Sequence, residues 1–105
     1  MSDKITYTKK DLINEIDKKI DIPKEKIKLI LEVVLDSMND IFTQDKSRIR
    51  LELRNFGVFE VKKTKPKPKA RNPKTNEIVH VPSRRKIHFK AGKKINQKLK
   101  KEWNE

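Results

Sequence analysis

Residues 48–61 read RIRLELRNFGVFEV and contain two apolar patterns separated by a turn. Ile49, Leu51 and Leu53 alternate with charged residues, which is the period-two pattern of a strand that buries one face. Asn55 and Gly57 mark a turn, and the apolar residues at 58, 59 and 61 open a second strand. We therefore predict two antiparallel strands joined by a short turn.

The basic run at residues 62–71 continues the second strand and has almost nothing apolar to bury, so it cannot lie on a core. Pro66 and Pro68 have the same parity, and their missing N–H groups fall on one edge, which a two-stranded ribbon tolerates. Residues 72–76 are rich in turn formers, and Asn76 can adopt a positive φ. Residues 77–89 then return beside the first strand, which predicts a long hairpin arm over about residues 62–87.

Two amphipathic helices are predicted before the sheet. Thr8 and Asp11 form an N-cap pair for the first helix, and Pro23 suits the first turn of the second. Apolar residues then recur over residues 27–42, and Leu29 and Val33 widen the apolar stripe until it covers most of the circumference of the second helix. Because a chain this short has only the first helix to cover one side, we predict that a second copy of the chain covers the other.

The 105 residues leave room for one small α+β domain. Its expected parts are a flexible extension at 1–7, a helical dimerisation part at 8–43, a sheet with its arm at 48–92, and a C-terminal helix at 93–103. Gly92 breaks the chain before that helix, in which Ile95, Leu99 and Trp103 are spaced four apart.

The net charge of +13 indicates a polyanionic partner. Residues 1–61 hold 12 basic and 12 acidic side chains, whereas residues 62–105 hold 16 basic and 3 acidic ones, so the excess belongs to the second part. Apolar residues interrupt this part at strand-like spacing, which favours a folded basic surface over a disordered tail. Nucleic acid is the first candidate.

Several other classes are excluded by the sequence. The chain has no Cys, and His80 and His88 have no paired ligands, so we predict no metal site and no disulfide. With two glycines and no nucleophile motif, we expect no enzyme, no cofactor and no small-molecule substrate. No apolar run is long enough for a membrane span or a signal peptide, so we expect a soluble cytoplasmic protein.

Three motifs then occur in order: FGVFEV at 56–61, RNPKTNE at 71–77 and FKAGK at 89–93. Together they resemble the bacterial HU and integration host factor (HU/IHF) family of DNA-bending, histone-like proteins, over roughly residues 8–99. The resemblance implies an intertwined dimer with a helical body, a saddle of three-stranded antiparallel sheet, and two β-ribbon arms that embrace duplex DNA in the minor groove. It also implies a nucleoid-associated protein that bends and condenses DNA, as a homodimer or with a paralogue.

The resemblance and the charge pattern together give the candidate site residues. Pro73 is the intercalating wedge that the resemblance implies, and Arg71 is the main candidate for the minor groove. The other arm candidates are Lys62, Lys63, Lys65, Lys67, Lys69, Asn72 and Lys74. Those expected to line the body against the flanking duplex are Arg84, Arg85, Lys86, Lys90, Lys93 and Lys94, with Lys9 and Lys10 beside the first helix. Phe56, Phe59 and Phe89 are expected in the core.

The chain departs from the family pattern at two positions, where Asn76 replaces a glycine and Ile87 replaces a proline. Asn tolerates positive φ and Ile extends a strand, so both changes preserve the shape. The arm and the loop before Phe56 are also a little longer than usual.

An RNA-binding or ribosome-associated protein is the alternative function. A protein that binds anionic membrane surfaces is a further alternative, although membrane binding of this kind prefers a basic amphipathic helix. The amino-acid sequence leaves open whether the protein prefers particular DNA sequences.

Overall fold

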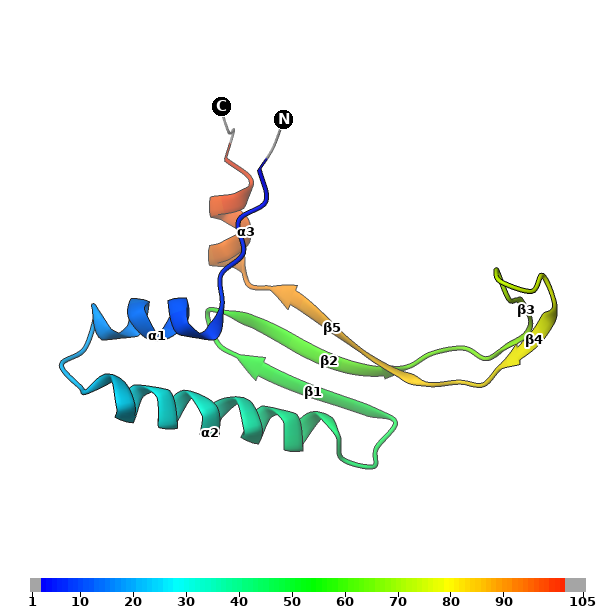
Figure 1. The fold of residues 1–105 in the computed structure, drawn as a ribbon, viewed down its shortest axis with the longest axis horizontal. Coiled ribbons are helices and arrows are strands. Elements are labelled where there is room, and N and C mark those ends of the chain that lie inside the picture. The colour runs from blue at the N-terminus through cyan, green and yellow to red at the C-terminus, as the bar shows by residue number, and fades with distance from the viewer. Residues whose placement is uncertain (1–2, 102–105) are drawn as a thin grey trace. The chain divides into compact units, whose positions relative to one another are not determined.

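The computed structural model describes residues 3–101, and the chain divides into two compact units, Met1–Asp40 and Ile41–Glu105. The predicted α+β class is confirmed (Figure 1). In chain order the elements are α1 (Lys9–Asp17), α2 (Lys24–Phe42), β1 (Arg48–Leu53), β2 (Gly57–Lys63), β3 (Lys67–Arg71), β4 (Ile78–Val81), β5 (Arg85–Ala91) and α3 (Lys93–Leu99). Among residues 3–101, no helix combines the length and the hydropathy that a membrane span requires.

The first unit is a pair of helices whose predicted starts are largely confirmed. The Asp11 carboxylate accepts hydrogen bonds from the Thr8 N–H at 2.8 Å and from the Thr8 hydroxyl at 3.0 Å, and the backbone bond is the larger cause of the lowered pKa of Asp11. Pro23 lies one residue before α2, not in its first turn as predicted. The Pro23 carbonyl accepts hydrogen bonds from the N–H groups of Lys26 and Ile27. A residue just before a helix donates no N–H to the hydrogen bonds of that helix, so proline is tolerated there.

The apolar stripe of α2 is too wide to be covered within one chain, as predicted. Ile27 is 2% exposed, but Leu29 and Val33 are 61% and 56% exposed. Leu35 and Val34 are also exposed. A helix face of this kind needs a partner outside the described chain to be removed from water.

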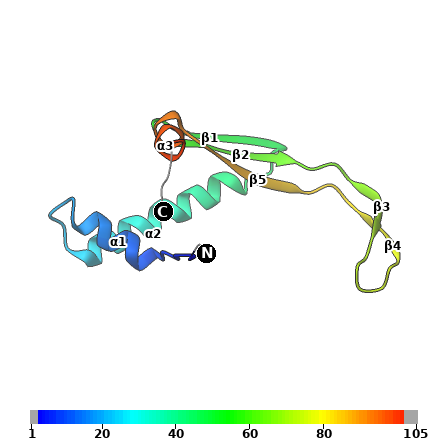
Figure 2. The same cartoon turned by 90° about the horizontal axis from the view of Figure 1, so that it is seen from above.

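The second unit is built on a three-stranded antiparallel sheet in the order β1-β2-β5 (Figure 2). The return strand therefore lies beside the second strand, and the prediction that residues 77–89 return beside the first strand was wrong. The register runs from Gly57 opposite Ala91 to Lys63 opposite Arg85. A chain that leaves the end of β2 reaches its antiparallel neighbour most directly by folding back on β2 itself.

One face of this sheet is apolar and carries a line of aromatic rings. Phe42 lies 5.5 Å from Phe59, Phe59 lies 4.7 Å from Phe89, and Phe89 lies 5.4 Å from Phe56, measured between ring centroids. Val61 beside them is 5% exposed. The rings pack on one another, but the expectation that they lie in the core is not met in the single chain, where Phe59 is half-buried and Phe56 and Phe89 are 47% and 46% exposed.

The predicted arm is a separate two-stranded sheet, β3 with β4, and not an unbroken continuation of β2 and β5. The strands are interrupted at residues 64–66 and 82–84, where Pro66 and Pro82 have no N–H to donate to a ladder. The three-stranded sheet consequently includes residues 62–63 and 85–87, which the sequence prediction placed in the arm.

The last helix is shorter than predicted. It begins after Gly92, as expected, but ends at Leu99, and Trp103 lies outside the described residues.

Candidate nucleic-acid interface

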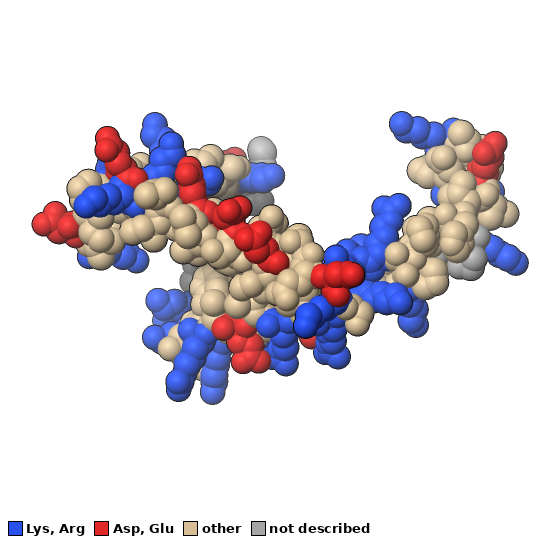
Figure 3. Space-filling view, turned by 90° about the horizontal axis from the view of Figure 1, so that it is seen from below, with Lys and Arg blue, Asp and Glu red and all other residues tan. Residues whose placement is uncertain are grey.

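The face of the sheet opposite the aromatic rings is strongly basic. Residues directly opposite each other in antiparallel strands point to the same face, so the register sets Arg48, Lys62 and Lys86 in one row. Arg50, Glu60 and His88 make the next row. We call this surface, with Glu52 and Lys90 in the row after that, the basic face, and Figure 3 shows Lys and Arg side chains projecting from the sheet.

Glu60 sits in the middle of the basic face and holds two of its cations. Its carboxylate accepts bonds from Arg48 Nε at 3.0 Å and Nη2 at 2.9 Å, and it lies 3.1 Å from Lys62 Nζ. The bond from Arg48, and then the one from Lys62, lowers the pKa of Glu60. The Glu60 side chain is only 17% exposed, so water screens these ion pairs weakly. Glu60 therefore neutralises part of the positive charge of Arg48 and Lys62 in the free protein.

At the root of the arm, Thr64 and Arg84 face each other across the gap that follows the sheet. The Thr64 N–H donates to the Arg84 carbonyl at 2.6 Å, the Thr64 hydroxyl donates to the same carbonyl at 3.0 Å, and the Arg84 N–H donates to the hydroxyl at 2.9 Å. Beside them, the Arg85 guanidinium donates to the carbonyls of Gln44 and Lys46. The loop before β1 is therefore tied to the start of β5.

The arm carries exposed cations along its length. Lys65, Lys69 and Arg71 are exposed on the segment that leads to the tip, and Lys74 is exposed in the tip itself, whereas the side chain of Lys67 lies outside the described part of the arm. The Lys and Arg side chains of this ribbon point away from it in several directions (Figure 3). Such a ribbon buries little apolar surface and carries many positive charges. A polyanion that can follow the shape of the ribbon would neutralise them.

The tip is a closed turn that presents Pro73 to solvent. The Asn72 N–H donates to the Glu77 carbonyl at 2.7 Å, and the Asn72 carboxamide oxygen accepts the Lys74 N–H at 2.9 Å. Asn72 thus closes the turn that the sequence predicted over residues 72–76, while the DNA contact predicted for it stays a prediction. Pro73 is exposed on this turn, and Asn76 has the predicted positive φ, of 62°.

The structure separates the residues expected to line the body. Lys90 is on the basic face, and Lys93 and Lys94 are exposed in the first turn of α3. Arg84 and Arg85 lie at the opposite end of β5 from α3 and belong with the root of the arm, whereas Lys86 is in the first row of the basic face. A strand of seven residues places its two ends far apart.

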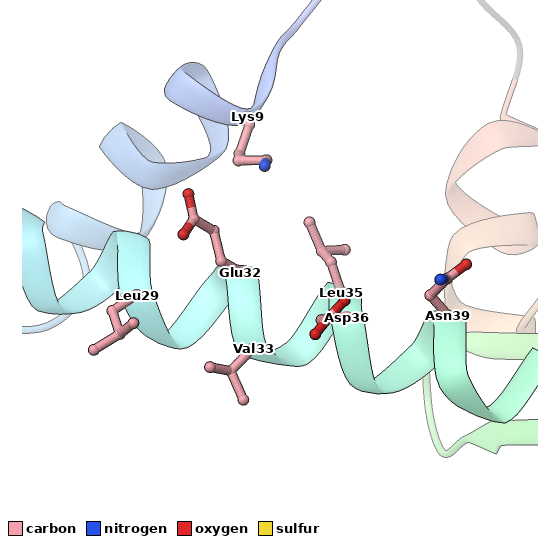
Figure 4. Close-up of a pocket in the computed structure, with 7 residues that line it drawn as sticks. All are labelled: Lys9, Leu29, Glu32, Val33, Leu35, Asp36 and Asn39. Carbon is pink, nitrogen blue, oxygen red and sulfur yellow. The ribbon is translucent and has the colours of Figure 1, made fainter.

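Lys9 and Lys10 belong to the first unit. Lys9 lines an open hollow together with Glu32, Asp36 and apolar residues of α2 (Figure 4). Acidic side chains beside this lysine reduce the local positive potential there, which makes Lys9 a weaker phosphate ligand than the lysines of the arm.

Arg48, Arg50 and His88 were not among the predicted site residues. The signal for the two arginines was present, because they occupy the polar positions of an alternating strand whose other face is buried. Their place beside Lys62 and Lys86 depends on the strand register, which the alternation does not give. Among the described residues, no cluster of three His, Asp or Glu side chains could hold a metal ion.

The fold and this surface are those of a small basic protein with a β-ribbon arm. Comparison with known proteins agrees, since the family described as "Bacterial DNA-binding protein" matches residues 7–100, and the chain belongs to this family in its HU/IHF branch.

Individual relatives are similar over most of their length. The chain is 38% identical to the probable DNA-binding protein HU of Chlamydia trachomatis, over 88% of this chain and 89% of that protein. It is 34% identical to the integration host factor subunit beta of Nitrosomonas europaea, over 86% and 83%. A cocrystal structure of Anabaena HU with DNA matches with a TM-score of 0.80 and 27% identity, covering 91% of this chain and all of that one.

Proposed function

We propose that the protein is an architectural DNA-binding protein that binds duplex DNA on the basic face and with its arm, and that bends it. One observation carries the proposal: the basic face, the root of the arm and the arm itself are cationic within one unit, and the arm ends in an exposed proline. Neutralising phosphates along this path releases counterions and supplies affinity that does not depend on sequence. Membership of the HU/IHF family supports the same function.

The arm is proposed to enter the minor groove, with Pro73 as the wedge. An apolar ring at the end of a cationic ribbon can unstack one base step, at a cost of a few kcal/mol, which further phosphate contacts along the bent duplex then offset. Arg71 lies two residues before Pro73, where a guanidinium suits the negative potential of a narrow A·T groove. The arm lysines, including Lys65, Lys67 and Lys69, are assigned to the phosphates on either side.

The working form is proposed to be a dimer, homodimeric or paired with a paralogue, in the cytoplasm at the nucleoid. The exposed apolar stripe of α2, with Leu29 and Val33 more than half exposed, is the surface that a second copy would cover. A dimer also supplies two arms, and two kinks separated along one duplex bend it more than one kink does.

The test compares Pro73→Ala with Pro82→Ala, which removes a proline from the arm root and leaves the tip intact. Affinity and bend angle are measured by fluorescence energy transfer on matched intact and nicked duplexes. If Pro73 is a wedge, Pro73→Ala reduces bending of intact DNA more than it reduces binding to nicked DNA, where the base step is already largely unstacked.

Equal losses on both duplexes would rule out the wedge, and an equal effect of Pro82→Ala would assign the loss to arm stiffness. Competition with a double-stranded RNA of the same length tests the class of partner. Preference for the RNA would overturn the proposed function, because A-form RNA has a wide, shallow minor groove that does not fit an intercalating tip.

A further inference from the structure

Asn76 stands at the tip of the arm in a backbone conformation that glycine adopts more easily. Its φ is 62°, in the left-handed region, where an L side chain carries a steric cost that Asn meets better than most residues. Its N–H donates to the Asn72 carbonyl at 2.7 Å and closes the turn. The turn therefore needs the backbone of this residue but not its side chain, and glycine would satisfy it at lower cost.

The side chain of Asn76 makes a second contact, which the turn does not require. Its carboxamide oxygen accepts a hydrogen bond from Arg71 Nη1 at 3.0 Å. Arg71 is the last residue of β3 and is opposite Ile78 in β4, an apolar residue that offers the guanidinium no hydrogen bond. Among the described residues, the Asn76 amide is thus the group that holds the Arg71 guanidinium in place.

The chemistry of this pair matters because the acceptor is neutral. A carboxylate at this position would orient the guanidinium and cancel its charge, as Glu60 does for Arg48 on the basic face. An amide oxygen orients the group and leaves the full positive charge. A guanidinium has five N–H donors, so one bond to Asn76 leaves the others free for a nucleic acid.

We propose that Asn76 is a positioning residue for DNA binding, which holds the Arg71 guanidinium in the orientation in which it enters the minor groove. The inference rests on the proposed function and adds a residue to it. Ordering a long, rotamer-rich side chain before binding reduces the entropy lost on association. For each arm, loss of the Asn76 side chain should then weaken binding by about threefold to tenfold.

The experiment is a double-mutant cycle of Asn76→Gly and Arg71→Ala, with Asn55→Gly as the matched control. Asn55 also has a positive φ, of 68°, but it lies in the turn between β1 and β2. Affinity is measured by fluorescence anisotropy on an intact duplex with a central A·T tract, over a range of salt concentrations. Urea unfolding of each variant checks that the fold is kept.

Asn76→Gly is expected to weaken binding while its salt dependence stays that of the unchanged protein, since no charge is removed. In the Arg71→Ala background the same substitution should have no effect, because the group it holds is gone. Asn55→Gly should bind like the unchanged protein.

Two results would overturn the inference and leave the proposed function standing. One is unchanged binding by Asn76→Gly when Arg71→Ala binds weakly. The other is an equal loss of affinity from Asn76→Gly with and without Arg71, which would assign the effect to the shape of the turn. If Arg71→Ala and Pro73→Ala both bind and bend like the unchanged protein, the tip does not contact DNA, and the proposed function fails with the inference.

Discussion

Replacing Gly57 by Ala should destabilise the sheet, and the structure gives the reason. A Cβ at residue 57 would lie 2.6 Å from the Lys90 carbonyl oxygen and 2.6 and 2.7 Å from two carbons of the Phe89 ring. Gly57 has no positive φ, so glycine is required here for space and not for backbone conformation. The carbonyl belongs to the strand paired with β2, and the ring is held between Phe56 and Phe59, so neither can move freely.

The expected cost of this overlap is about 1–3 kcal/mol in the free energy of unfolding. Alanine restricts the unfolded chain and returns about 0.4–1 kcal/mol, so the net effect is still destabilising. Urea unfolding at one fixed protein concentration measures it, because association would otherwise change the midpoint. Adding Phe89→Leu should relieve part of the cost, since a smaller side chain removes one of the two overlaps. A Gly57→Ala protein as stable as the unchanged one would refute this packing of β2 against β5.

Four further outcomes are expected. Replacing Lys65, Lys67 and Lys69 together by Ala should reduce the slope of log affinity against log salt concentration by about 0.9 for each phosphate that is no longer neutralised, while the stability of the fold stays unchanged. An unchanged slope in filter binding would show that the arm does not contact the DNA phosphates. Glu60→Gln should raise DNA affinity at low salt, because it removes the negative charge that pairs with two cations of the basic face. Titration calorimetry measures the affinity, and weaker binding by the variant would contradict the prediction. The pKa values of Asp11 and Glu60 are lowered in the folded state, so both carboxylates stabilise the fold at neutral pH. This stabilisation should be lost as the pH falls below their ordinary pKa values, near 4, and through the lower folded-state values. Thermal melts at a series of pH values would measure the loss. The melting temperature should rise with protein concentration if folding and dimerisation are linked, and calorimetry showing no dependence would count against the dimer.

Local signals in the sequence predicted local structure well. The Thr8 and Asp11 pair, the strand over residues 48–53 and the left-handed Asn76 each depend on a few neighbouring residues, and each is confirmed, although the alternation of burial ends at Leu51 because Leu53 is 36% exposed. The wide apolar stripe of α2 was also visible, because its cause is the helical period alone.

The pairing of distant segments was not predictable in the same way. The strand-like spacing of apolar residues predicts that residues 77–89 return as a strand, but it does not show whether β1 or β2 is the neighbour of that strand. The ion pairs of Glu60 follow from a register of Arg48 opposite Lys62, which no local pattern contains. The sequence analysis assigned Arg85 to the surface that faces the flanking duplex, and only the fold brings the carbonyls of Gln44 and Lys46 to its guanidinium.

The two-stranded ribbon of β3 and β4 has a consequence for the protein when no DNA is bound. A ribbon of two strands exposes a backbone edge on each side, and such edges readily pair with strands of other molecules. Pro68 lies within β3 and has no N–H to donate to a further strand, and the closely spaced lysines make a second ribbon of the same charge repel the first. The charges of the arm therefore also oppose aggregation of the free protein, and a variant without these lysines would be more prone to pair its arm with the arm of another molecule.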